Sequence, residues 1–275
     1  MISVLLALFL LFPGLLFSAQ STESHTQIGS GNKSLHIISV GNPANPPVLF
    51  IHGSPGDWKV WQRMMNDPKL AGFHLIAVDR PGYGQSQPGI PMLSISEQSN
   101  LIAEALKQNR SNQSAIIVGH SYGGAVASQL ATTKGIKVKG LVLAAPALDP
   151  KLENHFYYNV MNVAPQALPE KIRVSTKESV ALPNQLENLG PELTKINSVP
   201  VVFIQGSRDI VVSTKTVRYA RKVFANTTFD EVSLKGQGHS LPRENPESII
   251  QGVLQLSRSN PLLLNNSEDL PRVGR

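Results

Sequence analysis

Residues Gly119-His120-Ser121-Tyr122-Gly123 place a serine between two glycines at a predicted sharp turn. An apolar run at 115–118 predicts a strand before the turn, and residues 124–133 are compatible with a helix after it. At such an elbow the backbone of the serine is strained, and the flanking glycines let strand and helix approach closely enough to expose the hydroxyl. Ser121 is therefore the candidate nucleophile. A glycine-rich turn with an incidental serine is the alternative.

The chemistry of a nucleophilic serine requires a histidine and a carboxylate. The histidine accepts the hydroxyl proton, and the carboxylate holds its other ring nitrogen and stabilises the imidazolium. His239 lies in a Gly-Gln-Gly loop after the last predicted strand and is the candidate base. Asp209, shortly after the predicted strand 201–204, is the candidate acid. Asp149, which follows an earlier strand, is the alternative acid.

Attack on an acyl carbon creates an oxyanion, which backbone N–H groups can stabilise. One donor is expected to be the Tyr122 amide. The other is expected to be the Ser54 amide in His52-Gly53-Ser54-Pro55-Gly56, where the glycines permit close approach, although an ordinary Pro-Gly turn is the alternative for this segment. Five residues are predicted to support the site: His52, Gly53, Gly119, His120 and Gly123.

The surrounding elements predict one crevice for all these residues. Short β-branched runs alternate with longer helical patterns, which favours a doubly wound, mostly parallel α/β sheet with helices on both faces. Ligands bind beyond the carboxyl ends of the strands in such a sheet, and each candidate residue follows a strand. The expected strands are 35–40, 47–51, 75–78, 115–118, 141–144, 201–204 and 228–234, and the clearest helices are 94–109 and 246–256.

Taken together, residues 35–256 resemble the α/β-hydrolase superfamily. Residues 52–56 look like its oxyanion loop, Asp79-Arg80-Pro81-Gly82-Tyr83-Gly84 with Ser86 looks like the turn after its fourth strand, and residues 119–123 look like its elbow. The resemblance implies a triad of Ser121, Asp209 and His239. It also implies a small helical cap insertion at about 147–183.

Some neighbours within that superfamily differ from this sequence. Epoxide hydrolases and haloalkane dehalogenases of this fold attack with aspartate, whereas position 121 is serine. Proline-type aminopeptidases have an oxyanion loop similar to residues 52–56, but their elbow usually reads Gly-Gly-Ser-Trp-Gly. The cap segment also shows no evident acidic cluster for a substrate amine.

The ends of the chain differ in composition from its centre. Residues 4–17 form a nearly unbroken apolar run, shorter than the ~20 residues of a bilayer span and followed by small residues. Residues 1–21 are therefore predicted to be a cleaved signal peptide, with an uncleaved membrane anchor as the alternative, because no Lys or Arg precedes the run. Residues 22–256 are predicted to form the α/β domain, and residues 257–275 a polar tail.

The composition limits the kinds of molecule that the protein is expected to bind. The formal charge of +6 is spread over scattered Lys and Arg without interleaved aromatic residues, which disfavours nucleic-acid binding, and the absence of cysteine excludes disulfides. The sequence thus predicts an exported serine hydrolase that needs no cofactor or metal and cleaves a small-molecule carboxylic ester through an acyl-enzyme. The alternatives are a proline-type aminopeptidase or other amide hydrolase, and a non-catalytic small-molecule binding protein that retains the triad.

Overall fold

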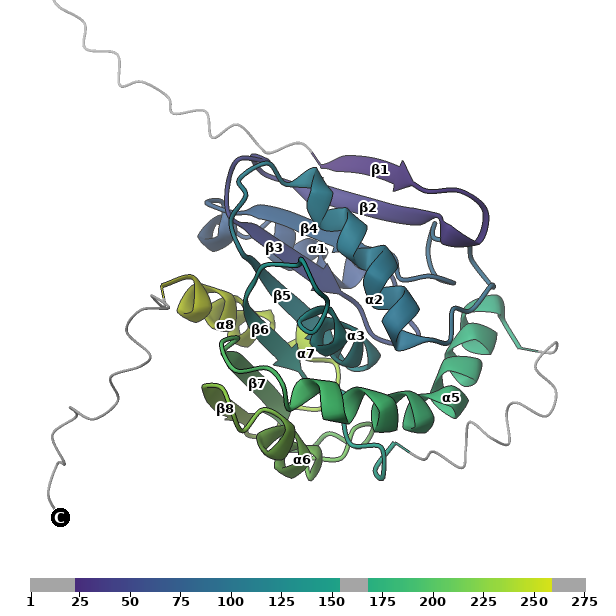
Figure 1. The fold of residues 1–275 in the computed structure, drawn as a ribbon, viewed down its shortest axis with the longest axis vertical. Coiled ribbons are helices and arrows are strands. Elements are labelled where there is room, and N and C mark those ends of the chain that lie inside the picture. Colours follow the sequence, from purple (N-terminus) through teal and green to yellow (C-terminus); the bar gives the residue numbers. More distant parts are fainter. Residues whose placement is uncertain (1–22, 154–167, 259–275) are drawn as a thin grey trace, which may run out of the picture.

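The computed structural model describes residues 23–153 and 168–258, and its strands form a single sheet (Figure 1). The strand order is β1-β2-β4-β3-β5-β6-β7-β8. β1 and β2 are antiparallel to their neighbours, and all other neighbouring strands are parallel. The strands are β1 (Ser24–Ile28), β2 (Leu35–Val40), β3 (Pro47–Ile51), β4 (His74–Val78), β5 (Ala115–His120), β6 (Val138–Ala144), β7 (Val201–Gly206) and β8 (Phe229–Leu234).

Both faces of the sheet are buried, which explains the continuous apolar runs in its central strands. Along β3, Leu49 and Ile51 pack into one core cluster, whereas Val48 and Phe50 pack into the other. Successive side chains of a strand point to opposite faces, so each face needs its own layer of helices. The predicted doubly wound α/β sheet is confirmed.

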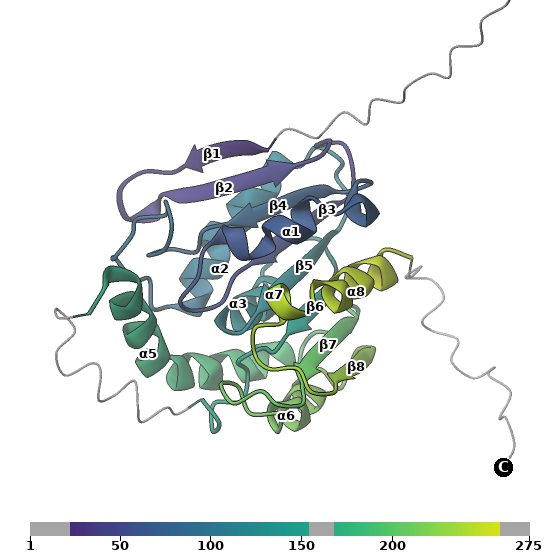
Figure 2. The ribbon, with the colours of Figure 1, turned by 180° about the vertical axis from the view of Figure 1, so that it is seen from behind.

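Two layers of helices cover the sheet, as the opposite views in Figures 1 and 2 show. One layer contains α2, α3, α5 and α6, and the other contains α1, α7 and α8. The helices are α1 (Gln62–Met65), α2 (Ile95–Ala103), α3 (Tyr122–Leu130), α5 (Glu170–Leu193), α6 (Thr216–Val223), α7 (Leu241–Glu244) and α8 (Pro246–Arg258).

The clearest predicted elements are present, with shifted ends. β6 begins at Val138, three residues before the predicted start, because Gly140 and Val138 also pair with β5, with a register irregularity at Lys139 between them. The predicted helix 94–109 is α2, which continues as a 3-10 helix over Glu104–Gln108. Pairing and tightening of a helix end are tertiary effects that a hydrophobic pattern does not contain.

Helix α5 crosses the predicted end of the cap. It runs through Pro183, and its later residues Leu186, Leu189 and Leu193 are buried in the core as their helical spacing predicts. Pro183 and Pro191 lie inside α5, and a proline lacks an N–H to donate and crowds the preceding turn, which is a usual cause of a bend. The helix changes direction along its length in Figure 1. The helix therefore runs from the predicted cap segment into the core without a break.

Several predicted segments fall outside the described residues. They are the leader at 1–21, the cap residues 154–167 and the tail from 259 onward. Within the described ranges, no helix is both long and apolar enough to cross a membrane.

Candidate active site

Ser121 occupies the turn between β5 and α3 in a strained backbone conformation. Its φ is 53°, a region that residues with a side chain rarely adopt and that costs on the order of 1–3 kcal/mol. The Ser121 amide donates to the Ala144 carbonyl at 3.1 Å, and its carbonyl accepts from Gly124 and Ala147 at 2.8 and 3.1 Å. These hydrogen bonds hold the strained turn against the end of β6.

The two glycines of the elbow are required by close packing. A Cβ on Gly123 would collide with the carbonyl oxygens of Ile51 and His52, and a Cβ on Gly119 would collide with the Gly123 carbonyl. Without side chains at these positions, α3 approaches both β3 and β5. The structure thus has the strand, turn and helix that the sequence predicts around Ser121.

His239 and Asp209 are joined at the carboxyl edge of the sheet. His239 Nδ1 lies 2.8 Å from Asp209 Oδ2, and the Asp209 side chain also accepts hydrogen bonds from the amides of Val211 and Val212. Burial alone would raise the pKa of Asp209, but the His239 hydrogen bond and the two amides outweigh it and lower that pKa. The carboxylate is therefore ionised and fixes His239 Nδ1 as a donor.

Asp149, the alternative acid, is engaged elsewhere. Its carboxylate accepts a hydrogen bond from the Lys151 amide at 3.0 Å, within its own turn. The aspartate bonded to His239 is Asp209.

His120 connects the elbow to His239. The two imidazole rings lie 4.9 Å apart between centroids, and His120 Nε2 is 2.9 Å from the His239 carbonyl oxygen. Burial, with a smaller contribution from His239, lowers the pKa of His120 to about 3, so its ring is neutral and carries its hydrogen on Nε2. Within the described residues the Ser121 hydroxyl makes no hydrogen bond to His239; such bonds often form only when substrate is bound.

The predicted oxyanion loop lies against the elbow. A Cβ built on Gly53 would be 3.0 Å from the Ser121 Cβ, so the backbone of Gly53 approaches Ser121 closely. Among the described residues the Ser54 amide has no acceptor, and Tyr122, as the first residue of α3, also has a free amide. His52 is fully buried, and its Nδ1 binds the Gly53 carbonyl at 2.7 Å.

Four polar residues to which the sequence pattern assigned no role support these groups. Gln205 Nε2 donates to Asp209 Oδ2 at 2.9 Å, and a buried cluster of Arg80, Gln98 and Glu178 lies behind the oxyanion loop. Gln205 could have been noticed as the polar residue of an otherwise apolar strand. Glu178 has no such signal, because a glutamate in a helix is usually solvent-exposed.

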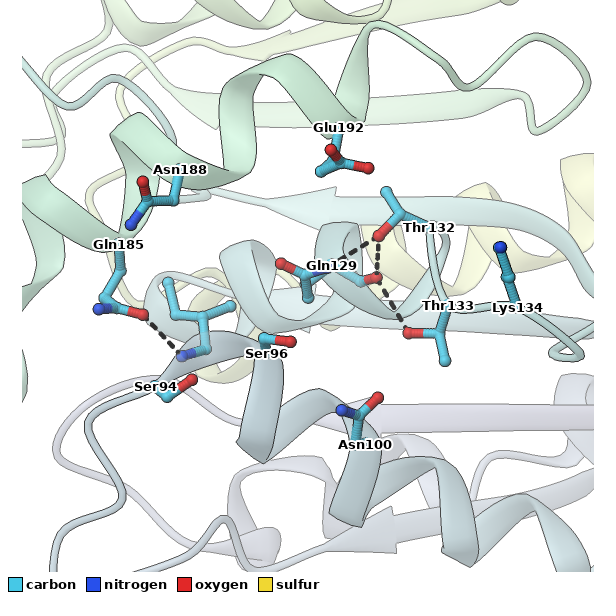
Figure 3. A pocket seen from close by; sticks show the side chains of 11 residues that line it. Ser94, Ser96, Asn100, Gln129, Thr132, Thr133, Lys134, Gln185, Asn188 and Glu192 are labelled. Carbon is cyan, nitrogen blue, oxygen red and sulfur yellow. Dashed lines mark hydrogen bonds between the residues drawn. The ribbon is translucent and has the colours of Figure 1, made fainter.

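A polar groove lies away from the triad, between α2, α3 and α5 (Figure 3). Its volume is about 730 Å³. Amide and hydroxyl groups line it, and some bind one another: Gln129 Nε2 donates to Thr132 at 2.8 Å. None of the predicted site residues lines this groove. The described residues contain no cluster of His, Asp or Glu able to hold a metal ion.

Comparison with known proteins supports the α/β-hydrolase fold. A family model described as the alpha/beta hydrolase fold matches residues 46–170. In structure, the chain is similar to a putative aryl esterase from Burkholderia cenocepacia, with a TM-score of 0.67, 19% identity, and coverage of 86% of this chain and 98% of the other. Residues 46–170 thus match the alpha/beta hydrolase family model, and the chain has the α/β-hydrolase fold.

Sequence relatives share only part of their length with this chain. Lipase LipV of Mycobacterium tuberculosis is 34% identical over 114 residues, 42% of each chain. An epoxide hydrolase of Caballeronia sordidicola is 36% identical over 102 residues, 35% of this chain and 29% of the relative. The chain spans less than half the length of these curated relatives, which therefore do not define its substrate.

Proposed function

We propose that the protein is a serine hydrolase that cleaves carboxylic esters, with Ser121 as nucleophile, His239 as base and Asp209 as the residue that orients it. The observation that carries the proposal is the 2.8 Å contact between His239 and Asp209, beside a serine held in a strained elbow. Similarity to a lipase and to an aryl esterase fold supports ester chemistry.

The reaction proceeds through an acyl-enzyme. Ser121 Oγ attacks the acyl carbon while His239 Nε2 takes its proton, and the carbonyl electron pair moves onto oxygen. The amides of Ser54 and Tyr122 stabilise this oxyanion. Collapse breaks the bond to the alcohol, which takes the proton from His239. Water then attacks the acyl carbon while His239 takes its proton. Collapse breaks the bond to Ser121 Oγ, which takes that proton back from His239, and the acid is released.

Epoxide hydrolase chemistry is not favoured by the site. Members of the fold with that activity attack with aspartate, and position 121 is serine. An aminopeptidase would need an acidic group for the substrate amine. The buried carboxylate of Glu178 is bound by Arg80 at 2.7 Å and is not available for that role.

Ester hydrolysis is tested with p-nitrophenyl esters from acetate to palmitate. We expect turnover by the protein and a loss of about 10³-fold or more in kcat for Ser121→Ala, because triad residues contribute on that scale. Labelling by a fluorophosphonate should also disappear in the variant. Turnover that the substitution leaves unchanged would refute the serine mechanism. Labelling of Ser121 with no turnover of any ester, tested beside an aminoacyl arylamide, would favour an amide hydrolase or a binding protein.

We also propose export, on the basis of the apolar segment at residues 4–17. Expression of the full chain should yield a mature product that begins near residue 22 outside the cytoplasm. Mass spectrometry of that product measures the cleavage position. An intact N-terminus in the membrane fraction would support the anchor instead.

A further inference from the structure

A carboxylate on α5 binds the predicted oxyanion loop directly. Glu178 is fully buried, and its Oε2 accepts hydrogen bonds from the hydroxyls of Ser54 and Tyr83 at 2.8 and 2.6 Å. Its Oε1 accepts from Arg80 at 2.7 Å and from Gln98 at 3.1 Å. Four side chains from three separate segments therefore converge on one carboxylate.

The charge of this carboxylate is balanced by Arg80, which is also fully buried. Burial would lower the pKa of Arg80, but Glu178 outweighs it and raises that pKa. Burial, followed by Glu178, raises the pKa of Tyr83, so the phenol keeps its hydrogen and donates it. The network is thus a paired ionic core with neutral donors around it.

Arg80 also orients the peptide whose N–H is the proposed oxyanion donor. Its Nη2 lies 3.3 Å from the Gly53 carbonyl, and its Nε lies 2.9 Å from the His52 carbonyl. The Gly53 carbonyl and the Ser54 N–H belong to one planar peptide unit and point in opposite directions. Holding the carbonyl toward Arg80 and His52 therefore directs the Ser54 N–H away from them.

The second proposed donor is tied to the same arginine. The Arg80 guanidinium lies 4.4 Å from the centre of the Tyr122 ring, a cation–π contact. Tyr122 is the first residue of α3 and provides the other amide. Both donor residues thus contact one ion pair, and one partner of that pair comes from the helix that leaves the cap.

We propose that Arg80 and Glu178 act as positioning residues for the oxyanion hole, with the Ser54 hydroxyl as the link between α5 and the donor amide. The proposal rests on the serine-hydrolase function above. Neither side chain touches the reacting atoms. Their contribution is to hold two backbone N–H groups where the negative charge develops, which is the condition for strong oxyanion stabilisation.

The test uses Ser54→Ala, which keeps the amide but removes the link, and Glu178→Gln, which keeps the size of the side chain but removes its charge. Loss of a whole oxyanion donor costs about 10²–10³-fold in kcat, so a misdirected donor should cost roughly 10-fold or more, with KM within about twofold. The double variant should lose no more than the worse single variant. Ser54→Thr, which restores a hydroxyl, should recover most of the rate.

A second readout separates positioning from folding. Active sites are counted by fluorophosphonate titration, so that kcat refers to competent enzyme only. Affinity for a trifluoromethyl ketone, which forms an oxyanion on Ser121, should fall by the same factor as kcat/KM. Affinity for the corresponding unreactive methyl ketone should not change. Glu187 is an exposed glutamate on the same helix, and Glu187→Gln is the matched control. Its kcat/KM and its affinities for both ketones should match those of the unmodified protein.

The possible outcomes separate the two proposals. If Ser121→Ala abolishes turnover but Ser54→Ala and Glu178→Gln keep the per-site kcat of Glu187→Gln, the positioning role is refuted and the serine mechanism stands. If Ser121→Ala has no effect, the function itself is refuted. If Glu178→Gln fails to fold, the per-site kcat of Ser54→Ala alone tests the positioning role.

Discussion

Two neighbouring residues of one turn, Asp79 and Arg80, build two different buried networks. Asp79 Oδ2 binds His36 on β2 at 2.8 Å, and its Oδ1 accepts from the Trp58 amide at 2.9 Å. Arg80 faces the elbow and the helix α5 instead. One network holds the antiparallel edge of the sheet, and the other lies behind the candidate active site.

The two networks also differ in how they end. From Asp79 the hydrogen bonds continue through His36 to His25, 3.0 Å away, and then to Glu23 at the exposed surface. The Arg80–Glu178 pair is sealed from solvent on both sides. A buried ion pair is costly to break, whereas a chain that reaches the surface can exchange a lost partner for water. We therefore expect the two networks to respond differently to substitution.

The largest loss of stability should come from breaking the buried Arg80–Glu178 ion pair. Arg80→Met leaves the Glu178 carboxylate buried without its cation, which should lower the free energy of unfolding by about 3–5 kcal/mol. Urea denaturation followed by circular dichroism measures the change. Arg80→Met combined with Glu178→Met should recover much of the loss, because no unpaired charge remains. Equal stability of the single and double variants would show that the pair does not behave as a unit.

A smaller loss of stability is expected from changes in the Asp79–His36 network. His36→Phe keeps a ring in the buried site but removes the imidazole bond to Asp79, which should cost about 1–3 kcal/mol. His25 lies at the exposed end of this hydrogen-bond network, so His25→Phe should lower the free energy of unfolding by less. The per-site kcat of both variants should stay near that of the unmodified protein, because this network lies at the hairpin edge. A loss of kcat comparable to that of Ser54→Ala would erase the distinction between the networks.

The smallest effect is a dependence of stability on pH near neutrality. Burial lowers the pKa of His52, with Arg80 adding to the shift, and burial lowers that of His120 to about 3. Both rings are neutral in the folded protein but take up a proton near pH 6.5 when unfolded. Stability from these groups is therefore full above pH 7 and is lost as pH falls from about 6.5 toward the folded pKa values.

Between pH 7 and pH 6 the expected loss is under about 1 kcal/mol for each histidine. Urea denaturation at pH 8, 7, 6 and 5 measures it. His120→Gln should flatten the curve, since its amide can donate to the His239 carbonyl without titrating. A curve that is flat for the unmodified protein would contradict neutral, buried histidines at these two positions.

The placement of the candidate site residues was predictable because each of them has a local signal. Ser121, Asp209 and His239 each follow a strand, and parallel strands end at one edge of the sheet, so order along the chain implies closeness in space. The structure brings Asp209 and His239 into contact and places His120 and Gly53 beside Ser121. The ends of β6 and the continuous helix through Pro183 were not predictable, because strand pairing and core packing override local preference.

By itself the amino-acid sequence determined the class of fold, the elbow and the residue types that could perform acyl transfer. It did so because hydrophobic periodicity and glycine positions are local properties of a chain. Only the tertiary structure decided that Glu178 pairs with Arg80, which is 98 positions away, and that the Ser54 hydroxyl joins them. Such a pair depends on desolvation and on mutual charge compensation, and neither exists until α5 packs behind residues 52–56.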